Sequence, residues 1–116
     1  FHWGKDFYKV KAAKTERNIA LLNLEEAKEK IELQVNQATF KVNEANKKLI
    51  MTRKNMEKAE ENLRNAQIGF EEGVLTTDNV LEAQTAWLQA QSEKIDAEID
   101  VRLCEVYLSK AMGLMK

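Results

Sequence analysis

The chain has 116 residues, with 18 Lys and Arg against 19 Asp and Glu and a formal net charge of −1. This balance argues against a dedicated nucleic-acid binder, which needs a basic face. A single histidine, His2, excludes a histidine triad or a multi-histidine metal site within the chain. We therefore expect no enzyme activity, no cofactor and no bound metal.

The sequence predicts two long helices. Proline is absent, and the four glycines stand where helices should begin or end. These glycines are Gly4, Gly69, Gly73 and Gly113. The intervening segments are rich in Ala, Glu, Lys, Gln and Leu, which are good helix formers. We predict an all-α fold with a long helix over about 5–70 and a shorter helix over about 77–112, roughly 95 Å and 54 Å long.

An apolar stripe follows the first helix with spacings that alternate four and three, which keeps its members on one helical face. It consists of Ile31, Val35, Ala38, Val42, Ala45, Leu49, Thr52, Met56, Ala59, Leu63, Ala66 and Phe70. Bulky and small residues alternate along it. This pattern is typical of a helix that interdigitates closely with a partner.

The second helix carries a complementary stripe. Its members are Thr76, Val80, Ala83, Trp87, Ala90, Lys94, Ala97, Val101, Cys104, Leu108, Ala111 and Met115. If the chain folds back at Gly73, bulky residues face small ones in nearly every layer; Ala59 then meets Trp87. Thr52 against Lys94 is the polar exception, and Ile31 against Met115 breaks the alternation at the open end. The sequence predicts a long antiparallel helical hairpin, a coiled coil with unequal arms.

Turn signals lie between the two stripes. Gly73 suits the left-handed conformation that ends many helices. Thr76 and Thr77 are both candidate N-caps of the second helix. If Thr76 is the cap, Asn79 occupies the third helical position, where a capping box prefers Glu or Gln.

Two apolar surfaces remain without a partner inside this hairpin. Residues 5–30 extend beyond the shorter arm and still carry apolar side chains. The second helix has a further apolar row away from the seam, formed by Leu81, Leu88, Ile95, Ile99, Leu103 and Val106. Because a helix that is apolar on two sides packs against two neighbours, we expect the hairpin to belong to a larger helical assembly. A hairpin that dimerises into a four-helix bundle would use the second row equally well.

Residues with reactive or charged side chains form no recognisable chemical motif. Carboxylate pairs such as Asp96 and Asp100 are interpreted as solvated charge or as partners of nearby lysines. Gly69 and Gly73 lack the Lys-Ser/Thr of a phosphate loop and stand at a helix C-terminus. Cys104 takes a small-residue position in the seam, so we assign it a packing role. No apolar stretch is long enough to span a membrane as a helix.

A segment around the turn carries a family resemblance. It reads Ala66-x-x-Gly69-Phe70-x-x-Gly73-Val74-Leu75-Thr76-x-x-Asn79-Val80-Leu81-Glu82-Ala83-Gln84. It resembles the periplasmic helical region of TolC-type outer-membrane efflux channels, in which an aromatic residue, two further residues, Gly and a short turn precede Asp-Val-Leu-Asp/Glu-Ala-Gln. Leu108-x-x-Ala111-x-Gly113 resembles the close of that family's short helix. Phe1-His2-Trp3-Gly4 resembles the handover from a barrel strand to the long helix.

The resemblance implies a homotrimer that exports small molecules or proteins together with a periplasmic adaptor and, indirectly, an inner-membrane transporter. Residues 1–116 would be a single helical hairpin segment in the periplasm, a fragment of a longer channel protein of the outer membrane. Contact with the membrane would be made only by barrel strands outside this chain. Other short helices of the parent protein would cover residues 5–30.

The resemblance also implies roles for residues at the turn. Gly73, Val74, Leu75 and Thr76 would face the adaptor, and Phe70, Asp78, Asn79 and Glu82 would lie near a gate or constriction. Two positions depart from the family pattern. Asn79 replaces the usual Asp, which leaves only the adjacent Asp78 as an acid at that level. Leu75 is apolar where some members have a basic gating residue.

Two other classes of protein could also contain such a hairpin. The coiled-coil hairpin of a periplasmic membrane-fusion adaptor has an Arg, a Leu four residues later and a Ser seven residues beyond that. No arginine in this chain satisfies the spacing, since Arg64 is followed by Ile68 and Leu75. A purely structural coiled coil would explain the seam but neither the turn pattern nor the unequal arms.

Overall fold

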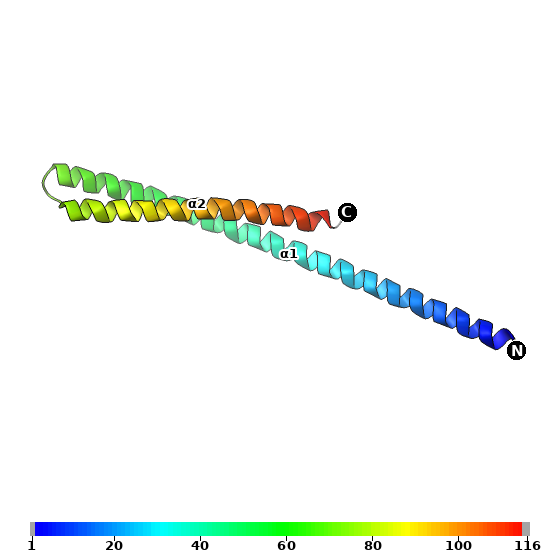
Figure 1. Cartoon of the computed structure of the whole chain (residues 1–116). Coiled ribbons are helices and arrows are strands. Elements are labelled where there is room, and N and C mark those ends of the chain that lie inside the picture. Colours follow the sequence, from blue (N-terminus) through cyan, green and yellow to red (C-terminus); the bar gives the residue numbers. More distant parts are fainter. Residues whose placement is uncertain (1, 115–116) are drawn as a thin grey trace.

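The part of the chain that the structure describes folds into two antiparallel helices joined by a short turn (Figure 1). The computed structural model describes residues 2–114, with side chains described from residue 4 onward. Helix α1 spans His2–Glu71 and helix α2 spans Thr77–Gly113. The molecule measures 108 × 21 × 14 Å, so α1 sets its whole length and α2 runs back along one part of it. The predicted all-α hairpin with unequal arms is confirmed.

The helix boundaries differ from the prediction by only a few residues. The long helix begins at His2 rather than near residue 5, and it continues to Glu71. Gly4 and Gly69 therefore lie inside α1, although glycine was expected to mark helix ends. Gly73 is the glycine that stops the helix, because it adopts a positive φ of 75°. In the segment that resembles the junction between a barrel strand and the long helix, residues 2–4 are helical and Phe1 lies outside the described residues.

The predicted seam is the core of the molecule. Among residues 4–114, eleven are buried, all of them at seam positions: Ala38, Ala45, Leu49, Thr52, Met56, Ala59, Ala66, Ala90, Ala97, Val101 and Ala111. One cluster joins Ala45 and Leu49 to Ala97 and Val101, with Cys104 packed against it. A second joins Met56 and Ala59 to Ala90, with Trp87 packed against it. These clusters confirm the pairing of large with small side chains; Met115 lies outside the described residues.

A polar layer interrupts this core where it was expected. Thr52 is only 3% exposed, yet its side chain is satisfied within its own helix. Its hydroxyl donates a hydrogen bond of 2.9 Å to the carbonyl oxygen of Leu49. Lys94, at the facing position of α2, is half-buried. A long lysine stem can cover apolar surface while its ammonium reaches water, so this layer needs no buried charge.

Much apolar surface stays exposed in the hairpin. Every residue from Gly4 to Lys30 is exposed, and so is the second apolar row of α2. Helix α1 adds exposed Leu33, Phe40, Ile50, Met51 and Ile68 on its outer side. Within residues 2–114, neither helix combines the length and the apolar character needed to cross a membrane.

Candidate functional site: the hairpin tip

The tip is built by a Schellman motif at the end of α1. The Val74 N–H donates to the carbonyl oxygen of Gly69 at 2.8 Å, and the Gly73 N–H donates to that of Phe70 at 3.0 Å. These are the two bonds that define the motif when a left-handed glycine follows the helix. Gly73 supplies that left-handed residue with φ 75°. The local sequence thus fixes where α1 stops and in which direction the chain leaves it.

Two apolar residues of the turn take opposite orientations. Val74 is 76% exposed and is the most exposed of the large apolar side chains described. Leu75 is half-buried and folds back onto α1, where its side chain lies against Gly69. Its N–H also donates to the Gly69 carbonyl oxygen at 3.0 Å. Of the two apolar side chains predicted to face an adaptor, Val74 therefore projects into solvent while Leu75 is partly withdrawn.

The second helix opens with a complete capping box. Thr76 is the N-cap, and its hydroxyl oxygen accepts a bond of 3.3 Å from the Asn79 N–H. The Asn79 Oδ1 in turn accepts from the Thr76 N–H at 2.9 Å and from the Thr76 hydroxyl at 2.7 Å. Asn79 thus performs the reciprocal role usually taken by Glu or Gln. Between the two predicted caps, the structure selects Thr76.

The residues predicted to lie near a constriction are on the surface around this turn. Phe70 is 48% exposed although it continues the seam, because α2 begins only at Thr77 and leaves it incompletely covered. Asp78 and Glu82 are exposed on the first two turns of α2. The side chain of Asn79 is engaged in the cap. The structure thus brings all four to one end of the hairpin.

The sequence around the tip has an excess of acidic residues, which the apolar stripes and turn motifs did not indicate. Residues 65–93 contain five acids and neither Lys nor Arg. The acids are Glu71, Glu72, Asp78, Glu82 and Glu93. By contrast, α1 carries six Lys or Arg residues between 41 and 58. A simple scan of charge along the chain would have revealed this asymmetry.

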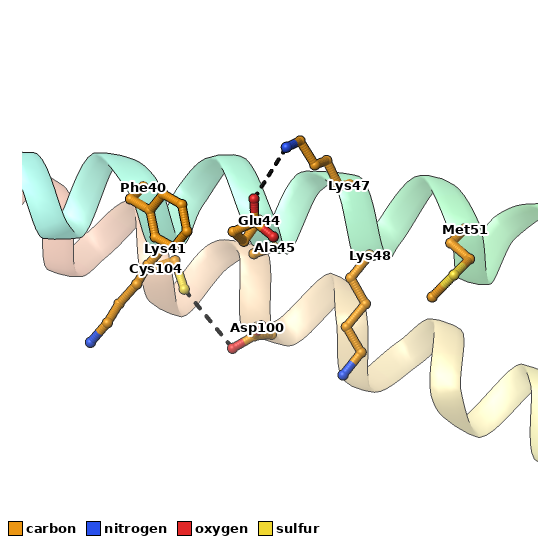
Figure 2. Close-up of a pocket in the computed structure, with 9 residues that line it drawn as sticks. All are labelled: Phe40, Lys41, Glu44, Ala45, Lys47, Lys48, Met51, Asp100 and Cys104. Carbon is orange, nitrogen blue, oxygen red and sulfur yellow. Dashed lines mark hydrogen bonds and ion pairs between the residues drawn. The ribbon is translucent and has the colours of Figure 1, made fainter.

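A shallow groove of about 590 Å³ lies midway along the paired helices (Figure 2). Its lining comes from Phe40, Lys41, Glu44, Ala45, Lys47, Lys48 and Met51 of α1 and from Asp100 and Cys104 of α2. Lys47 is paired with Glu44 at 3.1 Å, and Cys104 Sγ lies 3.9 Å from Asp100 Oδ1. Among the described residues, no group of three or more His, Cys, Asp or Glu could hold a metal ion. Cys104 packs against the seam cluster, and Asp100 lies one turn away from it on the same helix, so we interpret the groove as a packing surface.

The geometry defines a long unequal hairpin whose outer faces and tip are available to other helices. Comparison with protein families agrees with this class: the sequence model of the outer membrane efflux protein family matches residues 1–114. The chain belongs to the outer membrane efflux protein family. Comparisons with curated proteins and with solved structures give no significant match. The family is one of transport proteins, which agrees with the expectation of a non-enzyme.

Proposed function

We propose that this chain is the periplasmic helical hairpin of a trimeric outer-membrane efflux or secretion channel. The family match over residues 1–114 carries the proposal, and it favours a channel over an adaptor or a purely structural coiled coil. The unequal arms support it, because the part of α1 beyond α2 leaves an exposed face that further helices of a tunnel wall can cover. In this proposal residues 1–116 form one segment of a longer protein, located in the periplasm.

The exposed apolar rows support assembly into a wall of helices. Monomeric soluble proteins rarely leave large contiguous apolar surfaces exposed. Here the outer side of α2 exposes Leu81, Leu88 and Ile95 at heptad spacing, and α1 exposes Phe40 and Met51 beside the groove. Neighbouring helices of the same channel would cover both surfaces.

The overhang of α1 supports the same arrangement at the other end. Its apolar residues include Phe7, Val10, Leu21 and Leu24, all exposed. They lie beyond the end of α2, so only helices outside this chain can cover them. We assign this role to other short helices of the parent protein.

The tip is proposed as the contact point for a periplasmic adaptor, which would link the channel to an inner-membrane transporter. Gly73, Val74, Leu75 and Thr76 would form the contact, with Val74 as its most exposed large apolar side chain. Phe70, Asp78, Asn79 and Glu82 would lie at the constriction nearby. Asn79 acts there mainly through its cap, which leaves Asp78 and Glu82 as the charged members of the set.

Substitution Gly73→Pro tests the tip in the full-length channel. Proline cannot adopt φ 75° and lacks the N–H that Gly73 donates to Phe70, so the turn must change while both helices persist. Crosslinking to the adaptor is read from a cysteine at Val74, in a Cys104→Ala background. A cysteine at exposed Leu22 in the overhang serves as the negative control.

We expect efficient crosslinking from position 74, little from position 22, and a strong loss at position 74 in Gly73→Pro with unchanged helicity by circular dichroism. Equal crosslinking with and without proline would remove the tip from the adaptor contact.

A further inference from the structure

Gly69 lies inside α1 with its backbone in ordinary helical geometry, since Gly73 is the one glycine with a positive φ among the described residues. Its conformation therefore does not require glycine. Glycine within a helix is less favourable than alanine, and such a residue commonly has a packing reason.

The packing reason is the side chain of Leu75. A Cβ placed on Gly69 would lie 2.6 Å from Leu75 Cδ1 and 2.8 Å from Leu75 Cγ. Both distances are far below van der Waals contact, and the Cγ atom is not a freely moving chain end. Any side chain at position 69 must therefore displace Leu75. Gly4 and Gly113, in contrast, have nothing within 4 Å of such a Cβ.

Gly69 constrains Val74 and Leu75 through its backbone as well as through the space it leaves for the Leu75 side chain. The Gly69 carbonyl oxygen accepts the N–H groups of Val74 and Leu75, at 2.8 Å and 3.0 Å. With Leu75 seated on the glycine and both amides fixed, the adjacent Val74 is left pointing outward at 76% exposure. The direction of the Val74 side chain thus depends on the packing of Leu75 against Gly69.

We propose that Gly69 is a positioning residue: by accepting Leu75 onto α1, it presents Val74 as the apolar side chain that a partner's tip receives. This inference rests on the proposed function, because it specifies how the adaptor contact is oriented. The partner chemistry it implies is a small apolar depression the size of a valine side chain.

The test is a cycle of four full-length channels: wild type, Gly69→Ala, Leu75→Ala and the double variant. Gly113→Ala is the matched control, since it adds the same methyl group to a helical glycine in open space. Two quantities are measured in each protein. The first is crosslinking of a cysteine at position 74 to the adaptor, and the second is hydrogen exchange of the amides of residues 74 and 75.

Because overpacking strain is of the size that shifts an equilibrium about tenfold, we expect Gly69→Ala to lower crosslinking and amide protection about tenfold when Leu75 is present. In the Leu75→Ala background the same methyl group should change amide protection less than about twofold, since the clash is gone. Gly113→Ala should change neither quantity.

Two results would overturn the inference: amide protection in Gly69→Ala equal to wild type, or an equal loss with and without the leucine side chain. Absence of crosslinking in the wild-type channel would instead contradict the proposed adaptor contact. Hydrogen exchange would still report on the packing of Leu75 against Gly69 in that case. Failure of this inference and failure of the proposed adaptor contact are therefore distinguishable.

Discussion

Helix α1 contains two regions that share one pattern and differ in surroundings. Counting back from Ile31, the alternation of three and four continues through Lys28, Leu24, Leu21, Arg17, Lys14, Val10 and Phe7. In the paired region the members of this stripe are buried or half-buried against α2, apart from Phe70 at the tip, whereas in the overhang every member is exposed. A periodic apolar stripe therefore predicts a helix face that packs against another helix. The length of α2 determines how much of that face is covered within the same hairpin.

The overhang stripe also differs in chemistry. Three of its seven positions before Ile31 are cations, Lys14, Arg17 and Lys28, while the paired stripe of α1 contains none. Lysine and arginine can lay their stems over apolar surface only where their charged ends reach water. The overhang should therefore have a wetter and less tightly packed interface than the hairpin seam.

The sharpest test of this comparison substitutes leucines four heptads apart. Leu49 is 9% exposed in the seam and Leu21 is 54% exposed in the overhang. In the isolated chain, Leu49→Ala should lower the free energy of unfolding by about 2–5 kcal/mol, because it leaves a cavity beside Ala97 and Val101. Leu21→Ala should change it by about 0.5 kcal/mol or less, as for an exposed residue.

Urea unfolding followed by circular dichroism measures both leucine variants. Similar losses for the two would mean that the overhang is covered in solution, and the comparison would fail for the isolated chain.

A second test asks whether the seam pairs large with small side chains as described. Ala59→Leu should cost about 1–3 kcal/mol of unfolding free energy, since Ala59 is buried in the cluster against which Trp87 packs. Adding Trp87→Ala should recover part of that loss, because the removed indole leaves space for the new leucine. Thermal unfolding of the two single variants and the double variant measures the coupling. A double variant no more stable than Ala59→Leu contradicts the register.

A third test compares the turn with the open end. Thr76→Ala removes the side chain that accepts the Asn79 N–H, and N-cap losses of this kind cost about 0.5–2 kcal/mol. Hydrogen exchange should increase first in residues 77–80 and leave the open end near Ala111 unaffected. Uniform acceleration along α2 would mean that the cap is coupled to the whole hairpin rather than to its tip.

The smallest effect is expected for Asn79→Asp. The Asn79 Oδ1 acts only as an acceptor in the capping box, a role that a carboxylate oxygen fills equally well. A negative charge near a helix N-terminus is also favourable by about 0.3–1 kcal/mol. The variant should thus be as stable as the native chain or slightly more so in thermal unfolding. A clear loss would show that the amide N–H₂ group has a partner at the tip.

Most of the fold could be predicted from the sequence because it depends on periodicity. The four-three stripes, the alternation of size and the left-handed glycine together specify α1, α2 and their register. The position of the polar layer at Thr52 could be predicted, but the hydrogen bond that satisfies its hydroxyl could not. This hydroxyl donates to the Leu49 carbonyl oxygen within the same helix.

The tip was less predictable because its details depend on short contacts between particular atoms. Gly69 was interpreted as a helix end, whereas it is a helical residue that leaves space for Leu75. Asn79 was considered a poor partner for a capping box, yet its shorter side chain reaches the Thr76 backbone. A glycine inside a helical pattern, shortly before a turn, was the available signal for the first of these.

The unbroken run of α1 has a mechanical consequence. Sharp kinks in helices arise at proline and a few other local defects, and this chain contains no proline. Over a length of 108 Å, a tilt of a few degrees at the N-terminal end therefore sweeps the turn sideways by several ångströms. A rod of this kind converts small rotations at one end into large displacements at the other. Motion of the tip therefore depends on the structure that packs against the overhang.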